Sequence, residues 1–405
     1  MSVFSEFPLS PALLNRLAAT EIISPTPIQS QAIPALLAGR DVVGQASTGS
    51  GKTLAYALPL LQACYPKHRG VQALVIVPTR ELAVQVGGVL ASLAGQSGVR
   101  VALLYGGRPI RAQQLALARG DQVVVATPGR LLDHLKQKSI SLSGVRYLVL
   151  DEADEMLDQG FGPDVERILA QTPPGRQTSL FSATLPAWVQ RTAARHLHDP
   201  LTIMLGTEAQ DRPAIEQMVY EVNEKDKPQV LRRLIDRQVH GSTIVFGRTK
   251  HRVKHMAIQL ASEGYRAAAL QGNMSQNARE RVIADFRAGR VQVLLATNVA
   301  ARGLDLEDVN LVINYELPES AEWFTHRAGR TGRMGKTGQA VTLLEPTDLG
   351  KWRQIERVLE QRFPRHSWET GLPVAEPALP AVTAARVNTG SPQKRYSGPF
   401  RRPRS

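Results

Sequence analysis

Short, uninterrupted apolar runs recur along this chain, and they constrain its fold more than any other feature of the sequence. These runs are rich in Val, Leu and Ile and cover residues 73–77, 123–126, 147–150, 244–246, 293–296 and 311–313. Because they do not alternate with polar residues, we expect strands that are buried on both faces. Stretches with helical apolar spacing lie between them, for example residues 81–93 and 254–263. The pattern predicts an α/β fold with β-α-β repetition, parallel sheets and right-handed crossovers.

Polar side chains follow several of these runs at the point where each predicted strand ends. They occupy residues 78–81, 127–130, 151–154, 182–184 and 297–298. In open α/β sheets, ligands bind at the carboxyl ends of the strands. These endings therefore predict two sheets whose carboxyl ends face a common ligand.

Length and composition divide the chain into two domains, a linker and a tail. Its 405 residues are enough for two or three domains. The polar segment that ends at Pro213 disfavours a continuing helix. We therefore expect domains at residues 1–207 and 214–365, joined by a short flexible linker at 208–213. Residues 366–405 are rich in proline and end in a basic stretch, so we expect a disordered tail there.

The charge and the cysteine content bear on partners and compartment. The formal net charge of +13 indicates a polyanionic partner, which could be a nucleic acid or a membrane surface. The single cysteine, Cys64, forms no internal disulfide and favours a reducing compartment. Residues 1–20 include Glu6 and do not resemble a signal peptide, and no apolar run reaches the roughly 20 residues of a membrane helix. We expect a cytoplasmic protein that does not enter a membrane.

A glycine-rich segment lies between a short apolar stretch and a helical pattern. It consists of Ala46, Ser47, Thr48, Gly49, Ser50, Gly51, Lys52 and Thr53. In such a loop, glycines let backbone N–H groups approach phosphate oxygens, the lysine contacts the β and γ phosphates, and the threonine hydroxyl is a ligand of Mg²⁺. The segment differs from the usual phosphate-loop pattern because Ala46 takes the place of the first glycine. We expect a nucleoside triphosphate here, rather than an ordinary turn with a surface lysine.

Two carboxylates stand directly after a predicted strand. We assign Asp151 to Mg²⁺ through water and Glu152 to polarising the attacking water, as nucleotide hydrolysis requires. An acidic helix start in solvent is the alternative, since carboxylates favour a helix N-terminus. The presence of Lys52 upstream favours the catalytic interpretation.

Three arginines recur at a three-residue spacing in the segment from His326 to Arg333. That spacing can place Arg327, Arg330 and Arg333 on one face, and the glycines between them permit close approach. Charge on a transferring γ-phosphate is stabilised by such arginine fingers. A run of surface arginines is the alternative, and the spacing alone does not decide between the two.

Taken together, these residues resemble the DEAD-box ATP-dependent RNA helicase family, with a core similar to the bacterial type called Hera. The resemblance covers roughly residues 4–338 in family order. Its motifs are residues 25–29, 46–53, 78–82, 106–107, 127–130, 151–154, 182–184, 276–279, 296–305 and 326–333. It implies two tandem RecA-like domains, ATP and Mg²⁺ as cofactors, and RNA as the partner.

The resemblance also implies roles for individual residues. Phe4, or Phe7 nearby, would stack on adenine while Thr26 and Gln29 read it, and Asp305 would contact the ribose. The RNA backbone would be bound by Thr79, Arg80, Gly107, Thr127 and Arg130 in the first domain and by Gly272, Gln276, Arg279 and Thr297 in the second. Ser182, Ala183 and Thr184, with Asp154, would couple ATP to RNA. His326 would join the catalytic group, and Arg330 and Arg333 would be the arginine fingers.

The sequence departs from the family pattern at four positions, and none of them is a proposed catalytic group. Ile22 stands where a glycine–aromatic pair is usual, and Ala328 replaces a common isoleucine. Asn298 and Glu316 each replace a common aspartate.

The resemblance implies an RNA-dependent ATPase that closes its two domains on RNA and separates short duplexes locally, or remodels ribonucleoprotein particles. An ATP-controlled RNA clamp without unwinding and a DNA-directed helicase on the same scaffold are the alternatives. The basic end of the tail is either an RNA tether or a solubilising segment. We expect a monomer because no segment is dedicated to dimerisation.

Overall fold

The computed structural model describes residues 3–20, 22–47, 49–95, 97–205, 215–238, 241–298, 309–332 and 337–374. Several sequence predictions fall outside these residues, namely the linker at 208–213, Thr48, Asp305, Arg333 and the tail from residue 375 onwards.

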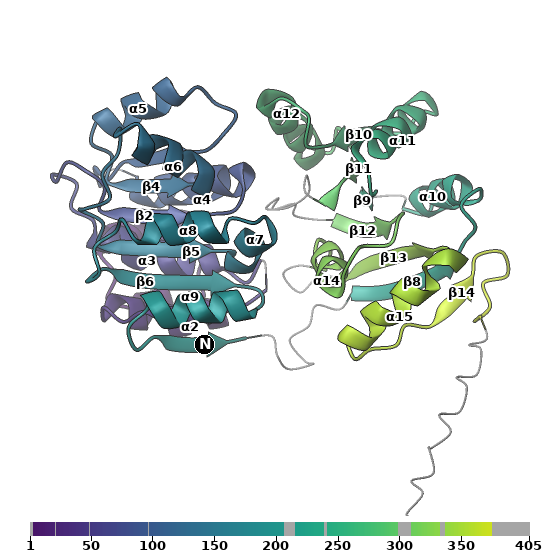
Figure 1. Ribbon diagram of the computed structural model, residues 1–405, viewed down its shortest axis with the longest axis horizontal. Coiled ribbons are helices and arrows are strands. Elements are labelled where there is room, and N and C mark those ends of the chain that lie inside the picture. The colour runs from purple at the N-terminus through teal and green to yellow at the C-terminus, as the bar shows by residue number, and fades with distance from the viewer. Residues whose placement is uncertain are drawn as a thin grey trace, which may run out of the picture.

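Each domain is built around one seven-stranded parallel sheet, and the two domains lie side by side (Figure 1). The first sheet has the strand order β3-β4-β2-β5-β6-β1-β7. Its strands are β1 (Val42–Gln45), β2 (Ala73–Ile76), β3 (Val101–Leu104), β4 (Val123–Ala126), β5 (Tyr147–Asp151), β6 (Gln177–Ser182) and β7 (Leu201–Met204).

The second sheet repeats the first, with the order β10-β11-β9-β12-β13-β8-β14. Its strands are β8 (Ile215–Glu221), β9 (Ser242–Phe246), β10 (Ala267–Leu270), β11 (Val293–Ala296), β12 (Val309–Asn314), β13 (Gly338–Leu344) and β14 (Arg365–Ser367). Counted from its own first strand, each sheet therefore has the same order. All the predicted apolar runs fall in strands, and the prediction of two RecA-like parallel-sheet domains is confirmed.

Helices cover both faces of each sheet. The first domain contains η1 (Phe4–Glu6), α1 (Pro11–Ala19), α2 (Pro27–Leu37), α3 (Lys52–Ala63), α4 (Arg80–Ala94), α5 (Ile110–Ala118), α6 (Pro128–Lys136), α7 (Ala153–Asp158), α8 (Gly162–Leu169) and α9 (Ala187–His196). The second contains α10 (Lys227–Asp236), α11 (Lys250–Ser262), α12 (Gln276–Arg287), α14 (Ala321–Ala328), η4 (Pro346–Asp348) and α15 (Leu349–Val358). Among the described residues, no helix has the length and apolar character needed to cross a membrane.

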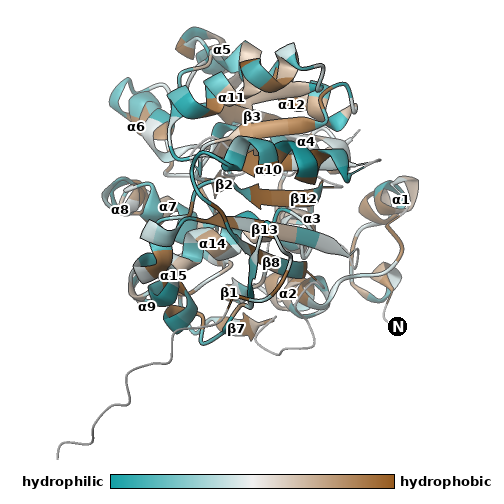
Figure 2. Cartoon of the chain, turned by 90° about the vertical axis from the view of Figure 1, so that its right-hand side faces the viewer, coloured by the Kyte–Doolittle hydropathy of each residue, from teal (hydrophilic) through white to brown (hydrophobic). Residues whose placement is uncertain are grey.

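The strands have apolar side chains on both faces because each face packs against its own layer of helices. In β2, Ala73 and Val75 belong to one hydrophobic cluster, whereas Leu74 and Ile76 belong to another. The second sheet is packed in the same way: Val245 of β9 belongs to one hydrophobic cluster, and its neighbours Ile244 and Phe246 belong to another. Figure 2 shows the result, with brown strands such as β3 and β12 inside and teal faces on outer helices such as α5 and α10.

The second sheet continues past residue 365, where we expected its domain to end. β14 pairs with β8, and the Arg365 guanidinium forms an ion pair with Glu221 of that strand. Just before it, Phe363 packs against Trp352 and Phe324, with ring centroids 5.5 Å apart in both pairs. These contacts hold the segment to the sheet even though prolines follow closely.

Candidate active site

The glycine-rich segment links the end of β1 to the start of α3, as the sequence predicted. Gly51 caps α3 with a backbone φ of 91°, in the left-handed region that favours glycine. A Cβ atom at Gly51 would lie only 2.3 Å from Nε2 of Gln29. Lys52 is buried and donates a hydrogen bond from Nζ to the Ala46 carbonyl oxygen at 2.7 Å. The loop therefore presents backbone N–H groups, a helix N-terminus and a lysine in one place, which is the set that binds phosphate.

Gln29 connects this loop to the start of α2. Its Oε1 accepts a hydrogen bond from the Thr26 backbone N–H at 2.9 Å, and its Nε2 donates to the Gly51 carbonyl oxygen at 3.0 Å. The Thr26 hydroxyl is buried, and none of the described residues hydrogen-bonds to it. The two residues assigned to base recognition are thus in direct contact with the phosphate loop.

The two aromatic side chains near the N-terminus pack against other side chains and do not present a free ring face for stacking on a base. Phe4 is 4% exposed and packs in the core with Leu9 and Leu13. Phe7 is the more exposed ring and contacts Phe4 edge to face, with centroids 6.0 Å apart. A role for Phe4 in adenine stacking therefore rests on the family resemblance and not on its exposure.

Asp151 ends β5 and is held from two sides. The Tyr56 hydroxyl donates to its Oδ2 at 2.8 Å, and the Glu152 backbone N–H donates to its Oδ1 at 3.0 Å. Burial raises the pKa of Asp151 to about 6, while the charge of Lys52 acts in the opposite direction. Tyr56 lies 95 positions earlier in the chain and was not identified from the sequence.

Glu152 caps α7 with φ 52° and ψ 53°, a left-handed conformation that costs a residue with a Cβ of order 1 kcal/mol or more. Its side chain is buried, and Oε2 has no hydrogen-bond partner among the residues that the structure covers. A strained backbone and an unpartnered buried carboxylate oxygen together mark a residue held for function.

The residues at this edge fit a magnesium–nucleotide complex. Mg²⁺ in phosphoryl-transfer sites is held by one or two carboxylates together with the phosphates of the substrate. Asp151 and the hydroxyl of Thr53 supply oxygen ligands of this kind beside Lys52. Among the described residues, no group of three or more His, Cys, Asp or Glu is arranged to hold a metal ion.

Asp154 joins the acidic motif to the segment after β6. Its Oδ2 accepts hydrogen bonds from both the backbone N–H and the hydroxyl of Thr184, each at 2.8 Å. Its own backbone N–H donates to the Ser182 hydroxyl at 3.1 Å. The Ala183 carbonyl oxygen accepts from Gln45 Nε2 at 3.3 Å, and Gln45 leads into the phosphate loop. The three residues predicted to couple ATP to RNA are thus connected to both ATP motifs.

His326 and Arg330 bring the second domain to this site. His326 lies on α14, and its burial lowers its pKa, while Asp154, Asp158 and Glu152 of the first domain act in the opposite direction. Arg330 is 8% exposed and donates from Nε to the His326 carbonyl oxygen at 3.3 Å. The structure therefore places His326 within electrostatic range of the acidic motif, and Arg330 beside His326.

Arg327 is used inside the second domain instead. Its guanidinium donates to Asn298 Oδ1 at 2.7 Å, to Asn314 Oδ1 at 2.9 Å and to the Glu316 carbonyl oxygen at 2.8 Å. Burial lowers its pKa to about 9, although the charges of Glu316 and Glu319 oppose this shift. Asn298 and Glu316, which depart from the family pattern, are both part of this environment.

The predicted RNA-binding residues of the first domain gather after β2, β3 and β4. The Thr79 hydroxyl caps α4 by accepting from the Leu82 backbone N–H at 3.2 Å. Arg80 is exposed and lies against Gly107, where a Cβ atom would be 2.4 Å from its Nη1. Thr127 begins α6, and Arg130 follows within its first turn. In the second domain, Gly272 follows β10 and Thr297 follows β11, at the matching ends of the repeated sheet.

Two ion pairs join the domains at this edge. Arg279 pairs with Glu81 at 2.7 Å, and the two side chains are only 9% and 11% exposed. Arg108 pairs with Glu280 at 2.7 Å with much greater exposure. Gln276, at the start of α12, is buried and faces Gly107. Glu81 and Arg108 were not identified as partners of these residues from the sequence, because the pairing joins segments that lie far apart in the chain.

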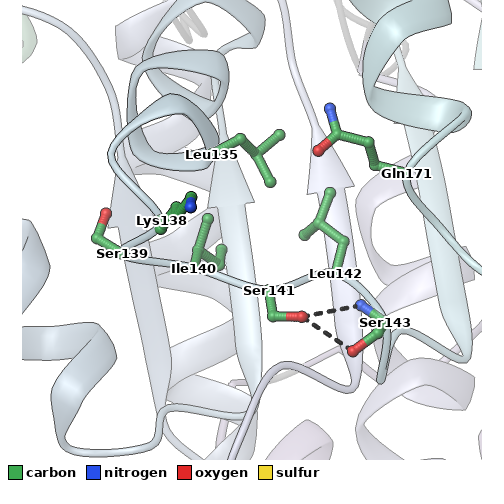
Figure 3. A pocket seen from close by; sticks show the side chains of 8 residues that line it. All are labelled: Leu135, Lys138, Ser139, Ile140, Ser141, Leu142, Ser143 and Gln171. Carbon is green, nitrogen blue, oxygen red and sulfur yellow. Dashed lines mark hydrogen bonds between the residues drawn. The ribbon is translucent and has the colours of Figure 1, made fainter.

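A hollow of about 500 Å³ lies elsewhere in the first domain (Figure 3). It is lined by Leu135, Lys138, Ser139, Ile140, Ser141, Leu142, Ser143 and Gln171. Leu135 lies in the last turn of α6, residues 138–143 lead from α6 to β5, and Gln171 lies between α8 and β6, so the hollow lies toward the amino ends of these strands. It contains none of the predicted site residues.

Comparisons with known proteins agree with this geometry. Residues 26–192 match the DEAD/DEAH box helicase family, and residues 226–335 match the helicase conserved C-terminal domain. The chain is 44% identical to the ATP-dependent RNA helicase CshA of Listeria monocytogenes over 363 residues, which is 90% of this chain and 70% of that protein.

Two solved structures are also similar. S. cerevisiae Dbp5 bound to RNA and ADP BeF3 is 33% identical, with a TM-score of 0.83 over 91% of this chain and 96% of that one. A DEAD box protein from the hyperthermophile Methanococcus jannaschii is 39% identical, with a TM-score of 0.54 over 90% of this chain and 98% of that one.

Proposed function

Because this chain belongs to the DEAD-box ATP-dependent RNA helicase family, we propose that it couples ATP binding and hydrolysis to closure of its two domains on RNA. This closure drives local, non-processive unwinding of RNA duplexes or remodelling of ribonucleoprotein particles. The observation that carries this proposal is the direct contact between the two domains at the ends of their strands, where Arg279 pairs with Glu81 and Arg108 pairs with Glu280.

In this proposal, the first domain binds ATP. Residues 46–53 surround the phosphates, Lys52 neutralises the β and γ phosphates, and Thr26 and Gln29 recognise adenine, with Phe4 as the aromatic neighbour. Asp151 and Thr53 would hold Mg²⁺, which when bound neutralises charge on the phosphates. Asp305, outside the described residues, would contact the ribose.

Glu152 orients the water that attacks the γ-phosphate and accepts its proton. The unpartnered Oε2 of Glu152 supports this role, since it is free to take a hydrogen bond from water. The second domain supplies Arg330, and Arg333 outside the described residues, as positive charges for the transferring phosphoryl group. His326 holds Arg330 through its carbonyl oxygen.

RNA would lie across the edge where the interdomain ion pairs are found, bound through its sugar–phosphate backbone. Thr79, Arg80, Gly107, Thr127 and Arg130 contribute from the first domain. Gly272, Gln276, Arg279 and Thr297 contribute from the second. Backbone contacts of this kind position a strand without reading its sequence.

Two observations support closure as the active step. Arg279–Glu81 and Arg108–Glu280 connect the domains directly. In addition, the TM-score with the RNA-bound Dbp5 is 0.83, whereas that with the M. jannaschii protein is 0.54 despite its higher sequence identity. The arrangement of the two domains, and not their sequences, accounts for that difference most simply.

We further propose that the protein acts as a monomer in the cytoplasm. The single cysteine agrees with a reducing compartment. The seven strands of each sheet are completed within one chain, so neither sheet needs a second copy.

The test is steady-state ATP hydrolysis with no nucleic acid, with single-stranded RNA and with single-stranded DNA of matched sequence. We expect strong stimulation by RNA alone, and we expect Glu152→Gln to lower kcat by about 10³-fold with ATP binding retained, as for loss of a catalytic base. Equal stimulation by DNA would favour a DNA-directed enzyme.

A duplex assay then separates unwinding from clamping. We expect release of a strand from a short duplex of about one helical turn and no release from one longer than three turns. RNA-dependent ATPase activity without release of any strand would instead identify an ATP-controlled clamp.

A further inference from the structure

A chain of hydrogen bonds leads from Arg130, one of the residues assigned to RNA, into the interior of the first domain. Arg130 Nη1 donates to the Arg108 carbonyl oxygen at 3.0 Å and to Gln113 Oε1 at 3.1 Å. The same Gln113 oxygen lies 3.1 Å from His134 Nε2, and His134 Nδ1 lies 2.8 Å from the Ser139 hydroxyl. Gln113 is 7% exposed and His134 is fully buried. These groups come from α5 and α6, and the predicted function gives Gln113 and His134 no role.

The directions of these bonds are fixed by Gln113. Its Nε2 donates to the Tyr105 carbonyl oxygen at 2.9 Å, so its Oε1 is the acceptor for both Arg130 and His134. His134 therefore carries its hydrogen on Nε2, and the Ser139 hydroxyl lies between two acceptors, His134 Nδ1 at 2.8 Å and the His134 carbonyl oxygen at 3.2 Å. Burial and the neighbouring charge of Arg130 both lower the pKa of His134, which favours this neutral form. Each member of the chain thus has a defined orientation.

Both side-chain hydrogen bonds of Arg130 are made by the same nitrogen of its guanidinium. That nitrogen is Nη1, and the Arg130 side chain is 14% exposed. Its Nη2 donates to none of the residues within the described ranges, and Asp133 lies on the Nε side at 3.5 Å. An arginine fixed in this way offers a planar N–H edge whose direction is set before a ligand arrives.

The geometry points to Gln113 and His134 as positioning residues that orient the Arg130 guanidinium toward a phosphate of the bound RNA strand. The inference rests on the proposed function, because it takes Arg130 as an RNA contact. A long arginine side chain that is free in solution loses rotamer freedom when it binds. Because Gln113 holds Arg130 beforehand, that loss does not weaken RNA binding.

The test uses Gln113→Met, which keeps the length of the side chain and removes the acceptor oxygen. The matched control is Gln114→Met on the same helix, because Gln114 is only partly buried and its side chain donates to Gln137 at the surface and not to Arg130. RNA-stimulated ATPase activity is titrated with a single-stranded oligonucleotide. We expect Gln113→Met to raise the RNA concentration for half-maximal activity about tenfold, equivalent to about 1.4 kcal/mol, with kcat at saturating RNA unchanged. The control should change neither value.

A double-mutant cycle distinguishes positioning from general stability. In an Arg130→Ala background, Gln113→Met should have no further effect on the RNA concentration needed, because the residue that it orients is gone. Thermal unfolding shows whether Gln113→Met folds normally. If it does not, His134→Leu, which removes the hydrogen bond on the other side of Gln113, replaces it in the same RNA titration.

Two results would overturn the positioning role of Gln113. Equal effects of Gln113→Met and Gln114→Met, or the same tenfold effect with and without Arg130, would overturn the positioning role while leaving RNA-dependent ATPase activity intact. If RNA does not stimulate the wild-type protein at all, the proposed function fails first, and the positioning role fails with it.

Discussion

In the first domain, the residues assigned to ATP are hydrogen-bonded to one another, whereas the second domain brings separate side chains to them. Gln29 bonds to the Gly51 carbonyl, Lys52 to Ala46 and Tyr56 to Asp151. Arg330, by contrast, is held within its own helix by the His326 carbonyl. One half of the site is built into a single sheet edge, and the other half depends on where the second domain lies.

This difference indicates how ATP binding and ATP hydrolysis are divided between the two domains. A nucleotide site whose phosphate and adenine contacts lie within one domain can bind ATP before the other domain closes on it. A positive charge that arrives only with the second domain acts on the rate and not on that first binding step. The following experiments test this division, in order of expected effect.

The largest effect is expected from Arg330→Ala. We expect kcat for RNA-stimulated hydrolysis to fall by about 10³-fold, because an arginine finger stabilises charge that develops only in the transition state. ATP binding to the protein without RNA, measured with a fluorescent nucleotide, should stay within about twofold of wild type. Arg353→Ala, on the exposed face of α15, serves as the control. A large loss of ATP affinity with Arg330→Ala would show that the two halves are not separable.

Arg327→Met should affect stability and not the rate directly. It removes a buried cation and leaves Asn298, Asn314 and the Glu316 carbonyl without their donor. We expect the free energy of unfolding of the second domain to fall by about 3 kcal/mol. Urea unfolding followed by tryptophan fluorescence measures this, since Trp323, Trp352 and Trp368 all lie in that domain. An unchanged urea midpoint would place Arg327 outside the core network.

The two interdomain ion pairs should differ despite equal distances. Glu81→Gln breaks the pair in which both side chains are about one-tenth exposed, and we expect the RNA concentration for half-maximal ATPase activity to rise about tenfold. Glu280→Gln breaks the pair with 43% and 37% exposure and should change it less than about twofold. Similar effects of both variants would mean that burial does not set the strength of these contacts.

The smallest effect is expected from Asn298→Asp. A carboxylate at this position would form a charge-assisted hydrogen bond with Arg327 Nε, now 2.7 Å from the Asn298 amide oxygen. We expect the second domain to gain about 0.5–1 kcal/mol in the free energy of unfolding, and the pKa of Arg327 to rise. The same urea experiment measures it, and the gain should shrink in high salt. A loss of stability would show that desolvating the new charge outweighs the pairing.

Sequence patterns predicted where the motifs lie in the fold because each motif is local. The phosphate loop, the acidic pair and the capping threonine Thr79 are set by a strand end and the helix that follows it. The same reasoning did not find Tyr56, Glu81 or Gln113, because each acts through a partner brought close by the strand order. Glu81 and Arg279, for example, are 198 positions apart in the chain.

The edge strands were harder to predict for a related reason. β10 consists largely of alanines, and β14 has three polar or charged residues, so neither shows the apolar run of a central strand. The pairing of β14 depends on Glu221 and Phe363 and not on its own sequence pattern. Arg333 and Asp305 remain predictions from the sequence.

The left-handed backbone at Glu152 has a consequence for how this protein can evolve. Glycine adopts that conformation without cost, so Glu152→Gly would relieve the backbone and remove a buried carboxylate that lacks a partner. Under the proposed mechanism, thermal stability and catalytic turnover therefore place opposite demands on this one position.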